Sequence, residues 1–179
     1  DISLIASNNL TTDQYEMFGV YMETQGNKPY LFAGNIYAPN RGEYTDYDIP
    51  PDALTDPDFA TLIKEAEKYL GYPYVWGGSS PSTSFDCSGF VCWVLRESGV
   101  YNIGRTTAQG IFNECAKIPP SESRPGDIIF FTGTYASSGA VSHVGIYVGN
   151  GMMIHCGNPI QYASVNNPYW TEHFYAYGR

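Results

Sequence analysis

A chain of 179 residues with 43% hydrophobic residues is long enough for one domain plus an extension, or for two small domains. Its formal net charge is −9, from 9 basic and 18 acidic residues, which argues against nucleic-acid partners and anionic membrane surfaces because both require basic patches. No apolar run reaches the length of a transmembrane helix, and no signal peptide is recognisable. Because the sequence begins at Asp1 without a methionine, we expect a mature or trimmed piece of a longer protein.

The first 55 residues show no strong hydrophobic period and are rich in Tyr, Asn, Gly and Pro. Two short alternating stretches, 30–33 and 35–37, are candidate strands, and Ile49-Pro50-Pro51-Asp52 is typical of a linker. We therefore expect an N-terminal extension or linker over residues 1–55, to which the sequence assigns no chemistry. It either packs over the main domain, residues 56–179, or connects that domain to a missing partner.

A helix is predicted to begin at Asp56-Pro57-Asp58, because an acidic N-cap, a proline at the first helical position and an acid in the first turn all favour a helix start. Gly71 is predicted to end it. An aromatic segment, 72–78, then leads to Cys87. One apolar face of the predicted helix is formed by Phe59, Leu62, Ile63, Ala66, Tyr69 and Leu70.

Cys87 falls where a loop is predicted to become a helix that ends at Ser98-Gly99, with Asp86 or Ser84 as its N-cap. The helix dipole and the unpaired N–H groups at such a position favour a thiolate and can stabilise an oxyanion. A lone cysteine here would more often be a small buried residue that opens a core helix. The rest of the chain must decide between these interpretations.

Residues 101–115 predict a turn and a short helix, and a turn at Arg124-Pro125-Gly126-Asp127 leads into the strands. Helices therefore come first and strands cluster after them, which predicts an α+β fold. The predicted strands are 128–131, 141–148, 152–156 and 174–177.

The four cysteines show neither CxxC spacing nor a histidine at zinc-finger distance, so we expect no structural metal. Two disulfides are conceivable, but a chain of this size does not need them for stability. Cys92 and Cys115 lie on the apolar sides of helical patterns, so we expect free core thiols.

Two of the three histidines belong to one predicted hairpin: His143 begins its first strand and His155 lies on the return. With a two-residue loop the two histidines would lie on opposite faces of the sheet. With the three-residue loop 149–151, Gly145 faces His155, and the histidines share a face as diagonal neighbours, roughly 7–8 Å apart. We predict the three-residue loop, because its last glycine suits a left-handed conformation and Gly145 leaves room for the rings.

A nucleophilic cysteine needs a base, and the base benefits from a third group that fixes its tautomer. Cys87, His143 and His155 can supply these three roles if they converge. Either histidine alone would more often be a hydrogen-bonded residue of a sheet face, which is what we expect for His173. For the pair together with Cys87 upstream, catalysis is the favoured interpretation.

Five blocks over about residues 57–179 resemble the NlpC/P60 family of cell-wall endopeptidases. The resemblance implies a papain-like α+β fold, in which a helix that carries the cysteine packs on an antiparallel sheet that carries the histidines. The blocks, in the family's order, are Tyr74-Val75-Trp76-Gly77-Gly78, Phe85-Asp86-Cys87-Ser88-Gly89-Phe90, Pro125-Gly126-Asp127-Ile128-Ile129-Phe130-Phe131, His143-Val144-Gly145-Ile146-Tyr147-Val148-Gly149-Asn150-Gly151 and Ile154-His155.

The activity that this resemblance implies is hydrolysis of peptidoglycan stem peptides by a cysteine endopeptidase through a thioester intermediate. The bond implied is the one between γ-D-glutamyl and a diamino acid, either meso-diaminopimelate or lysine. No cofactor and no metal are implied. The implied location is extracellular or in a bacterial cell wall, without membrane contact by this fragment, and we expect a tether to a larger cell-envelope protein.

Carried over by position, the resemblance implies Cys87 as nucleophile, His143 as base and His155 as the group that orients it. Tyr74 matches a tyrosine beside the catalytic cysteine, whose hydroxyl meets the substrate or the oxyanion. Asp86 and Ser88 match positions that bind a free N-terminal L-alanine amine in some members, although a helix cap explains Asp86 equally well.

Three other residues are interpreted more plainly. Arg105 resembles part of a further family segment and could meet a substrate carboxylate, but we expect it to be exposed to solvent. Trp76 is expected in the core. Cys156 stands where the family has a small residue, and we expect it to be tolerated by the packing.

Several alternatives remain open. The same three residues could serve an amidase or acyltransferase that acts on another amide or ester, or the domain could be a non-catalytic cell-wall module with an inert triad. It could also be the hydrolase end of a larger conjugation or phage machine. Residues 1–55 do not resemble the bacterial SH3 modules of some relatives, which leaves substrate selection open.

Overall fold

The computed structural model describes residues 41–179. Its central feature is a six-stranded antiparallel sheet with the strand order β3-β8-β4-β5-β6-β7, beside a two-stranded sheet of β1 and β2. The α+β order predicted from the sequence is therefore confirmed. The elements are η2 (Ala53–Thr55), α3 (Pro57–Ala66), η3 (Glu67–Tyr69), β1 (Ser79–Ser80), β2 (Ser84–Phe85), α4 (Cys87–Glu97), α5 (Ala108–Glu114), β3 (Lys117–Ile118), η4 (Pro120–Glu122), β4 (Ile128–Phe131), β5 (His143–Gly149), β6 (Met152–Cys156), β7 (Ile160–Ser164), α6 (Pro168–His173) and β8 (Phe174–Gly178).

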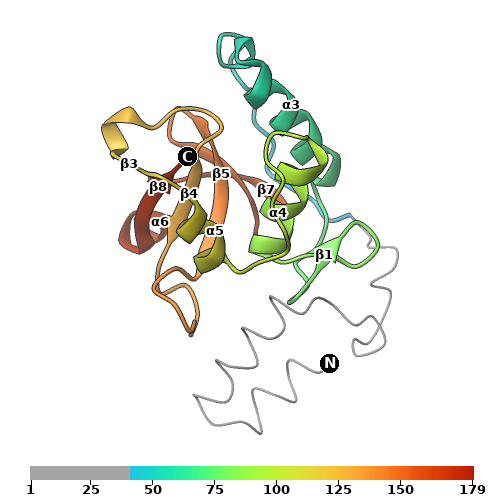
Figure 1. The fold of residues 1–179 in the computed structure, drawn as a ribbon. Helices are drawn as coiled ribbons and strands as arrows, with labels where there is room; N and C mark the ends of the chain where they lie inside the picture. The colour runs from blue at the N-terminus through green and yellow to red at the C-terminus, as the bar shows by residue number, and fades with distance from the viewer. Residues whose placement is uncertain (1–40) are drawn as a thin grey trace, which may run out of the picture.

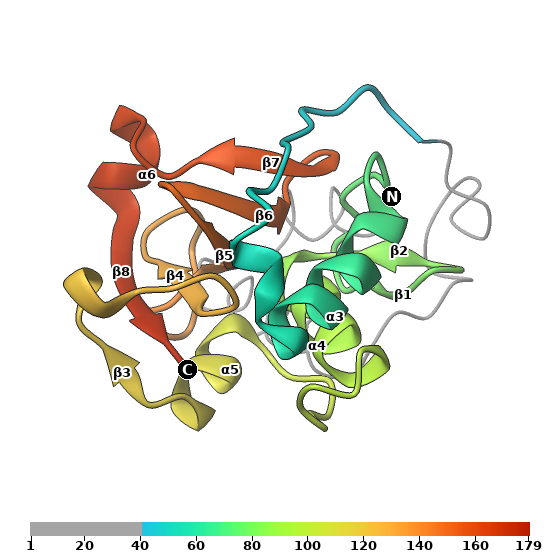
Figure 2. The ribbon, with the colours of Figure 1, turned by 90° about the horizontal axis from the view of Figure 1, so that it is seen from above.

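Helices α3, α4 and α5 lie on one side of the large sheet and α6 lies on the other (Figures 1 and 2). Each strand contributes side chains to both sides of the sheet, because successive side chains point to opposite faces. In β4, Ile128 and Phe130 pack toward α3, α4 and α5, whereas Ile129 and Phe131 join a second cluster that includes Trp170 of α6. The larger hydrophobic core therefore lies between the helices and the sheet.

Helix α3 begins as its sequence predicts. The side chain of Asp56 caps it by accepting hydrogen bonds from the backbone N–H groups of Asp58 and Phe59, and Pro57 occupies the first helical position. The helix tightens into the 3-10 turn η3, and Gly71 leaves it with a φ of 83°. The predicted start and end of this element are both confirmed.

The β5–β6 hairpin has the predicted odd offset, with Gly145 directly opposite His155. The extra residue does not lengthen the loop between strands. It forms a bulge, since Tyr147 pairs with Met153 while Gly149 pairs with Met152. The turn itself is Asn150-Gly151, both with positive φ. The predicted register is therefore confirmed, but the predicted three-residue loop 149–151 is wrong, because β5 extends to Gly149 and the extra residue lies in the bulge.

Residues 41–55 run along the outside of the domain without forming a strand. The backbone carbonyl of Thr45 accepts a hydrogen bond from the N–H of Tyr162 in β7, and the Tyr47 ring lies 5.7 Å from the Tyr162 ring between centroids. This part of the extension therefore packs on the main domain. The candidate strands 30–33 and 35–37 lie outside the described residues.

Within residues 41–179, no helix has both the length and the apolar character needed to cross a bilayer. All four cysteines lie in this part of the chain, and none of them forms a disulfide. Cys92 is buried as expected, and Cys115 is half-buried.

Candidate active site

Cys87 is the first residue of α4, as predicted, and Asp86 is its N-cap. The Asp86 side chain accepts a hydrogen bond of 2.7 Å from the backbone N–H of Gly89. Cys87 itself is completely buried, with a relative exposure of 0%. The positive end of the α4 dipole favours the thiolate form of Cys87. Because the residue has no surface exposed to solvent, a reactant reaches its sulfur only after neighbouring groups move.

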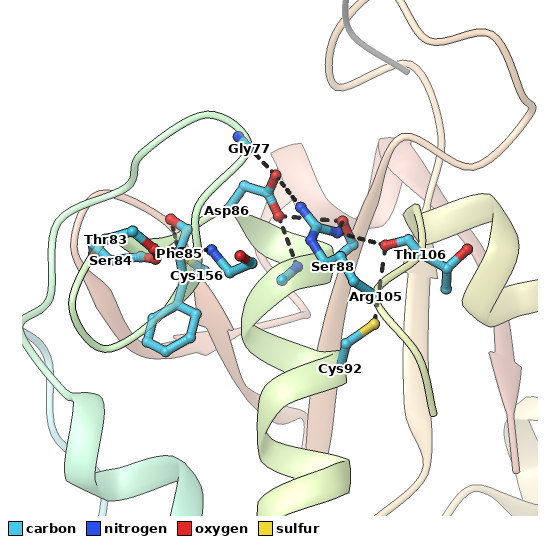
Figure 3. A network of polar contacts seen from close by, with 12 residues as sticks. Gly77, Thr83, Ser84, Phe85, Asp86, Ser88, Cys92, Arg105, Thr106 and Cys156 are labelled. Carbon is cyan, nitrogen blue, oxygen red and sulfur yellow. Dashed lines mark hydrogen bonds and ion pairs between the residues drawn. The ribbon is translucent and has the colours of Figure 1, made fainter. Parts of the chain in front are cut away.

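The Asp86 carboxylate is the centre of a polar network (Figure 3). Besides the cap bond, Asp86 accepts hydrogen bonds from the backbone N–H of Gly77 (2.9 Å) and from the Ser88 hydroxyl (3.2 Å). Arg105 donates to Asp86 Oδ2 at 2.7 Å and to the Ser88 hydroxyl at 2.8 Å. Asp86 and Ser88 are both completely buried. The network therefore ties α4 to the loops on either side of it.

Burial raises the pKa of the Asp86 carboxyl, while the Arg105 guanidinium and the donated hydrogen bonds lower it. The expectation that Arg105 is exposed to solvent is wrong. Its side chain is only 15% exposed, because the buried carboxylate of Asp86 needs a charged partner. Sequence reasoning missed this pairing because the two residues are separated by 19 positions and lie on different elements.

A close backbone approach explains the glycine in the Asp86-Cys87-Ser88-Gly89 run. A Cβ atom on Gly89 would lie 2.0 Å from the carbonyl oxygen of Gly78. That carbonyl also accepts a hydrogen bond of 3.1 Å from the N–H of Asp86. The loop that precedes Cys87 therefore packs directly against the first turn of α4, and only glycine fits at position 89.

The end of β6 is joined to the segment just before Cys87. The Cys156 thiol donates to the carbonyl oxygen of Phe85 at 3.2 Å. Cys156 is completely buried, and burial raises the pKa of its thiol well above the ordinary value. This residue is thus accommodated in the packing and adds a hydrogen bond. Because it follows His155 directly, the contact brings the histidine strand to the head of α4.

Tyr74 belongs to the same neighbourhood. It forms an isolated parallel bridge with Phe85, and its backbone N–H donates to the Asn158 side chain at 3.3 Å. Burial, and next the charge of Cys87, raise the pKa of the Tyr74 phenol well above its ordinary value. At neutral pH this hydroxyl therefore keeps its proton and can donate a hydrogen bond close to Cys87.

His143 and His155 are brought together as predicted. His143 Nε2 lies 2.9 Å from His155 Nδ1, and their ring planes stand at 83° to each other. Both side chains are buried, with relative exposures of 8% and 4%. Burial, followed by the charge of His155, lowers the pKa of His143 well below its usual range, and burial lowers the pKa of His155 to about 4.

Both imidazoles are therefore neutral at pH 7, and one ring donates to the other. Because the two neutral imidazoles are joined by a direct hydrogen bond, the position of one ring restrains the orientation of the other. This is the role that an orienting group has toward a general base.

Trp170 completes the surroundings of this pair, and the sequence analysis did not identify it. Its ring is stacked on His143 at an angle of 24°, with 5.1 Å between centroids, and meets the edge of His155 at 5.2 Å. It is carried by α6, which Asn167 caps by accepting a hydrogen bond from the Trp170 N–H at 2.9 Å. The Asn-Asn-Pro run before it was the available signal for this helix.

Trp76 does not lie in the core as expected, whereas His173 is hydrogen-bonded as expected. Trp76, expected in the core, is half-buried in the loop before Gly77, and its ring packs edge-on against Tyr135 at 5.0 Å. His173 is hydrogen-bonded as expected, since its Nδ1 lies 2.7 Å from the Thr132 carbonyl oxygen, but it lies at the end of α6. No group of three or more His, Cys, Asp or Glu side chains in the described part of the chain is arranged to hold a metal ion.

The fold and this site define a papain-like α+β protein. The sequence profile of the NlpC/P60 family matches residues 71–179, and the chain belongs to that family. The expected family and fold are thus confirmed.

Two curated relatives and one solved structure illustrate the similarity. The chain is 43% identical over 136 residues to the bifunctional muramidase/DL-endopeptidase CwlT of Bacillus subtilis, covering 75% of this chain and 40% of that one. It is 38% identical over 114 residues to the gamma-DL-glutamyl hydrolase of the same species, covering 62% and 27%. A lipoprotein-like NLP/P60 structure from Staphylococcus aureus superposes with a TM-score of 0.67 at 29% identity, covering 98% of this chain and 64% of that one. The chain therefore spans less than half the length of these curated relatives.

Proposed function

We propose that this protein is a peptidoglycan hydrolase, a cysteine endopeptidase that cleaves stem peptides between γ-D-glutamyl and a diamino acid. The observation that carries the proposal is the hydrogen bond between His143 and His155 on strands that reach the head of the helix bearing Cys87. Membership of the NlpC/P60 family, and relatives named for DL-endopeptidase and gamma-DL-glutamyl hydrolase activity, support this substrate class.

The histidine pair defines the tautomers that the reaction needs. His143 Nε2 is engaged with His155 Nδ1, so His143 Nδ1 is the nitrogen left to take the proton of the Cys87 thiol. Nδ1 must then be bare, so His143 carries its hydrogen on Nε2 and donates it to a bare Nδ1 of His155. His155 orients the base and does not itself move a proton.

In the first half of the reaction, the Cys87 proton passes to His143 Nδ1 and the sulfur bonds to the carbonyl carbon of the scissile amide. The resulting oxyanion is stabilised by N–H groups at the start of α4 and by the protonated Tyr74 hydroxyl. The C–N bond then breaks, the leaving amine takes the proton from His143, and a thioester remains on Cys87.

In the second half, His143 takes a proton from water while the water oxygen attacks the thioester carbon. The C–S bond breaks, the proton on His143 returns to the sulfur, and the γ-D-glutamyl acid leaves as its carboxylate after it releases the second proton of the water to solvent. Asp86, Ser88 and Arg105 hold the start of α4 in place during both halves. Asp86 and Ser88 already form internal hydrogen bonds, and a contact with the substrate would have to replace or share them. That contact stays a prediction.

The decisive experiment is to digest purified peptidoglycan and identify the new termini by mass spectrometry. The proposal expects a free γ-D-glutamyl carboxylate and a new amine on meso-diaminopimelate or lysine. Cys87→Ala should abolish this product while circular dichroism and the thermal midpoint stay close to those of the parent chain. A Cys87→Ala variant that is fully active on muropeptides would end the proposal, and a different new terminus would favour an amidase or acyltransferase.

A non-catalytic cell-wall module is distinguished by the reactivity of the thiol. Cys87 and Cys92 lie on the same helix and are equally buried, with relative exposures of 0% and 1%. A nucleophile should nevertheless react with iodoacetamide at pH 7 much faster than its neighbour, because access and activation are part of its function. Equal, slow labelling of the two thiols, mapped by peptide mass, would support the inert module.

The cell wall or the extracellular side of a bacterium is the setting that this substrate implies. An acidic domain gains nothing electrostatically by approaching an anionic wall, so we propose that a tether to a larger cell-envelope protein holds it there. Fractionation of cells that express the natural gene, with detection in wall and culture supernatant, tests this location.

A further inference from the structure

Trp170 is the one aromatic residue in the described chain whose ring contacts both imidazoles of the pair. It lies in parallel over His143 and edge-on to His155, so it restrains both rings from one side. Phe131 of β4 contacts the indole at 4.5 Å between ring centroids, with the ring planes tilted at 51°, and Tyr169 packs edge-on against it at 4.9 Å. The indole is thus held between the sheet and α6.

We propose that Trp170 is a positioning residue for the His143–His155 pair, holding the base in its orientation through ring stacking and keeping water off the hydrogen bond between the two histidines. This inference rests on the proposed function for its catalytic consequence. Its structural consequence, the restraint of the two imidazoles, can be measured without any substrate.

Stacking also fits the change of charge during the reaction. When His143 takes the thiol proton it becomes an imidazolium, and a cation over the face of an indole is stabilised by the ring quadrupole. The indole, whose plane lies at 24° to the His143 ring, therefore favours the protonated form of His143 that donates a proton to the leaving amine. Two ionisable side chains of α6 lie beyond the indole in the chain of contacts: Tyr169 contacts Trp170 at 4.9 Å between ring centroids, and His173 contacts Tyr169 at 4.5 Å.

The substitutions Trp170→Phe, Trp170→Leu and Trp170→Ala test the proposal. Trp170→Phe retains a ring and should keep kcat within about threefold of the parent, whereas Trp170→Leu retains apolar bulk without a π face. For Trp170→Ala we expect kcat to fall by about tenfold to a hundredfold with KM nearly unchanged, because a displaced base acts on chemistry more than on binding. Trp170→Leu should fall between these two.

The substrate-free measurement is an NMR titration of the imidazoles in the full chain carrying Cys87→Ala. Removing the indole has two opposite effects on the imidazoles: it takes away the cation–π stabilisation of protonated His143, and it admits water to both rings. Because burial is the largest cause of the lowered pKa of both histidines, the second effect should dominate, and Trp170→Ala should move the pKa of His143 and of His155 upward toward 6.5. If peptidoglycan is not a substrate at all, the proposed function fails, but this titration still tests the positioning role.

Tyr175→Ala is the matched control, because Tyr175 also lies in the C-terminal segment but packs on Phe112, away from the histidines. It should leave both the histidine titrations and kcat unchanged. Unmoved imidazole pKa values together with an unchanged kcat in folded Trp170→Ala would overturn the proposal. A lower thermal midpoint as the only change would do so too, because it would mean that the indole serves only stability.

Discussion

His143 Nε2 and His155 Nδ1 lie 2.9 Å apart across neighbouring strands, and this contact depends on a single extra residue in the hairpin. Without the bulge before Gly149, the register would shift by one and the two side chains would lie on opposite faces. The bulge therefore converts two ordinary strand residues into a coupled pair that is neutral at pH 7.

From this pairing we expect His143→Ala to be more damaging than His155→Ala. His143 moves the proton, so its loss should lower kcat by about 10²–10⁴-fold, the usual contribution of a general acid–base group. His155 only orients that ring, so His155→Ala should lower kcat less, and His155→Asn or His155→Gln should recover part of the loss because an amide oxygen can accept from Nε2–H. Single-turnover rates on a purified muropeptide measure the difference, and equal losses would contradict the ranking.

The sequence predicted this site well where local rules decide the structure. The helix start at Cys87 follows from capping and apolar spacing, and the shared face of the histidines follows from alternation in a hairpin of odd offset. The start of α3 and the strand 128–131 were predicted for the same local reasons.

What the sequence could not supply depends on contacts between distant elements. Arg105 was misjudged because only the folded chain shows the buried carboxylate that it serves. Strand β7 follows Asn158-Pro159, and helix α6 begins at Asn167-Pro168. Both dipeptides are also typical of plain turns, so the position of Trp170 over the histidines was not foreseen.

The Arg105–Asp86 ion pair should be important for stability. Asp86 is completely buried and the Arg105 side chain is 15% exposed, so Arg105→Ala leaves a buried carboxylate without its charged partner. We expect a loss of roughly 3 kcal/mol in the free energy of unfolding, measured by urea titration. Glu97→Gln is the matched control, because the Arg96–Glu97 pair on the same helix is exposed (35% and 42%) and should contribute less than about 1 kcal/mol. A similar small loss in both variants would show that the buried pair does not organise the site.

Stability should fall as the pH drops below the ordinary pKa of histidine. Burial lowers the pKa of His155 to about 4 and that of His143 well below 6.5. Below pH 6.5 the unfolded chain therefore binds protons on these histidines that the folded chain does not bind. The stability is therefore fully present above pH 6.5 and declines from there toward pH 4.

The decline should be about 1.4 kcal/mol per pH unit for each histidine, or about 2 kcal/mol for each between pH 6.5 and pH 5. Urea unfolding at pH 7, 6 and 5 measures this slope. His155→Gln removes one of the two titrating groups and should make the slope clearly shallower. An unchanged slope in that variant would mean that His155 does not titrate as its burial requires.

Gly145 is predicted to be indispensable to the geometry of the pair. A Cβ atom on Gly145 would lie 3.0 Å from His155 Cβ and 3.2 Å from the Ile154 carbonyl oxygen, and neither atom can swing away without moving the strand. Gly145→Ala should therefore cost about 1–3 kcal/mol of stability, as overpacking does, and displace the His155 ring. Gly104→Ala is the control, since no atom lies within 4 Å of its Cβ position. Muropeptide turnover should fall sharply in the first variant and stay unchanged in the second. Normal turnover by Gly145→Ala would show that the histidine pair tolerates a shift between β5 and β6, which contradicts the tight coupling inferred from their hydrogen bond.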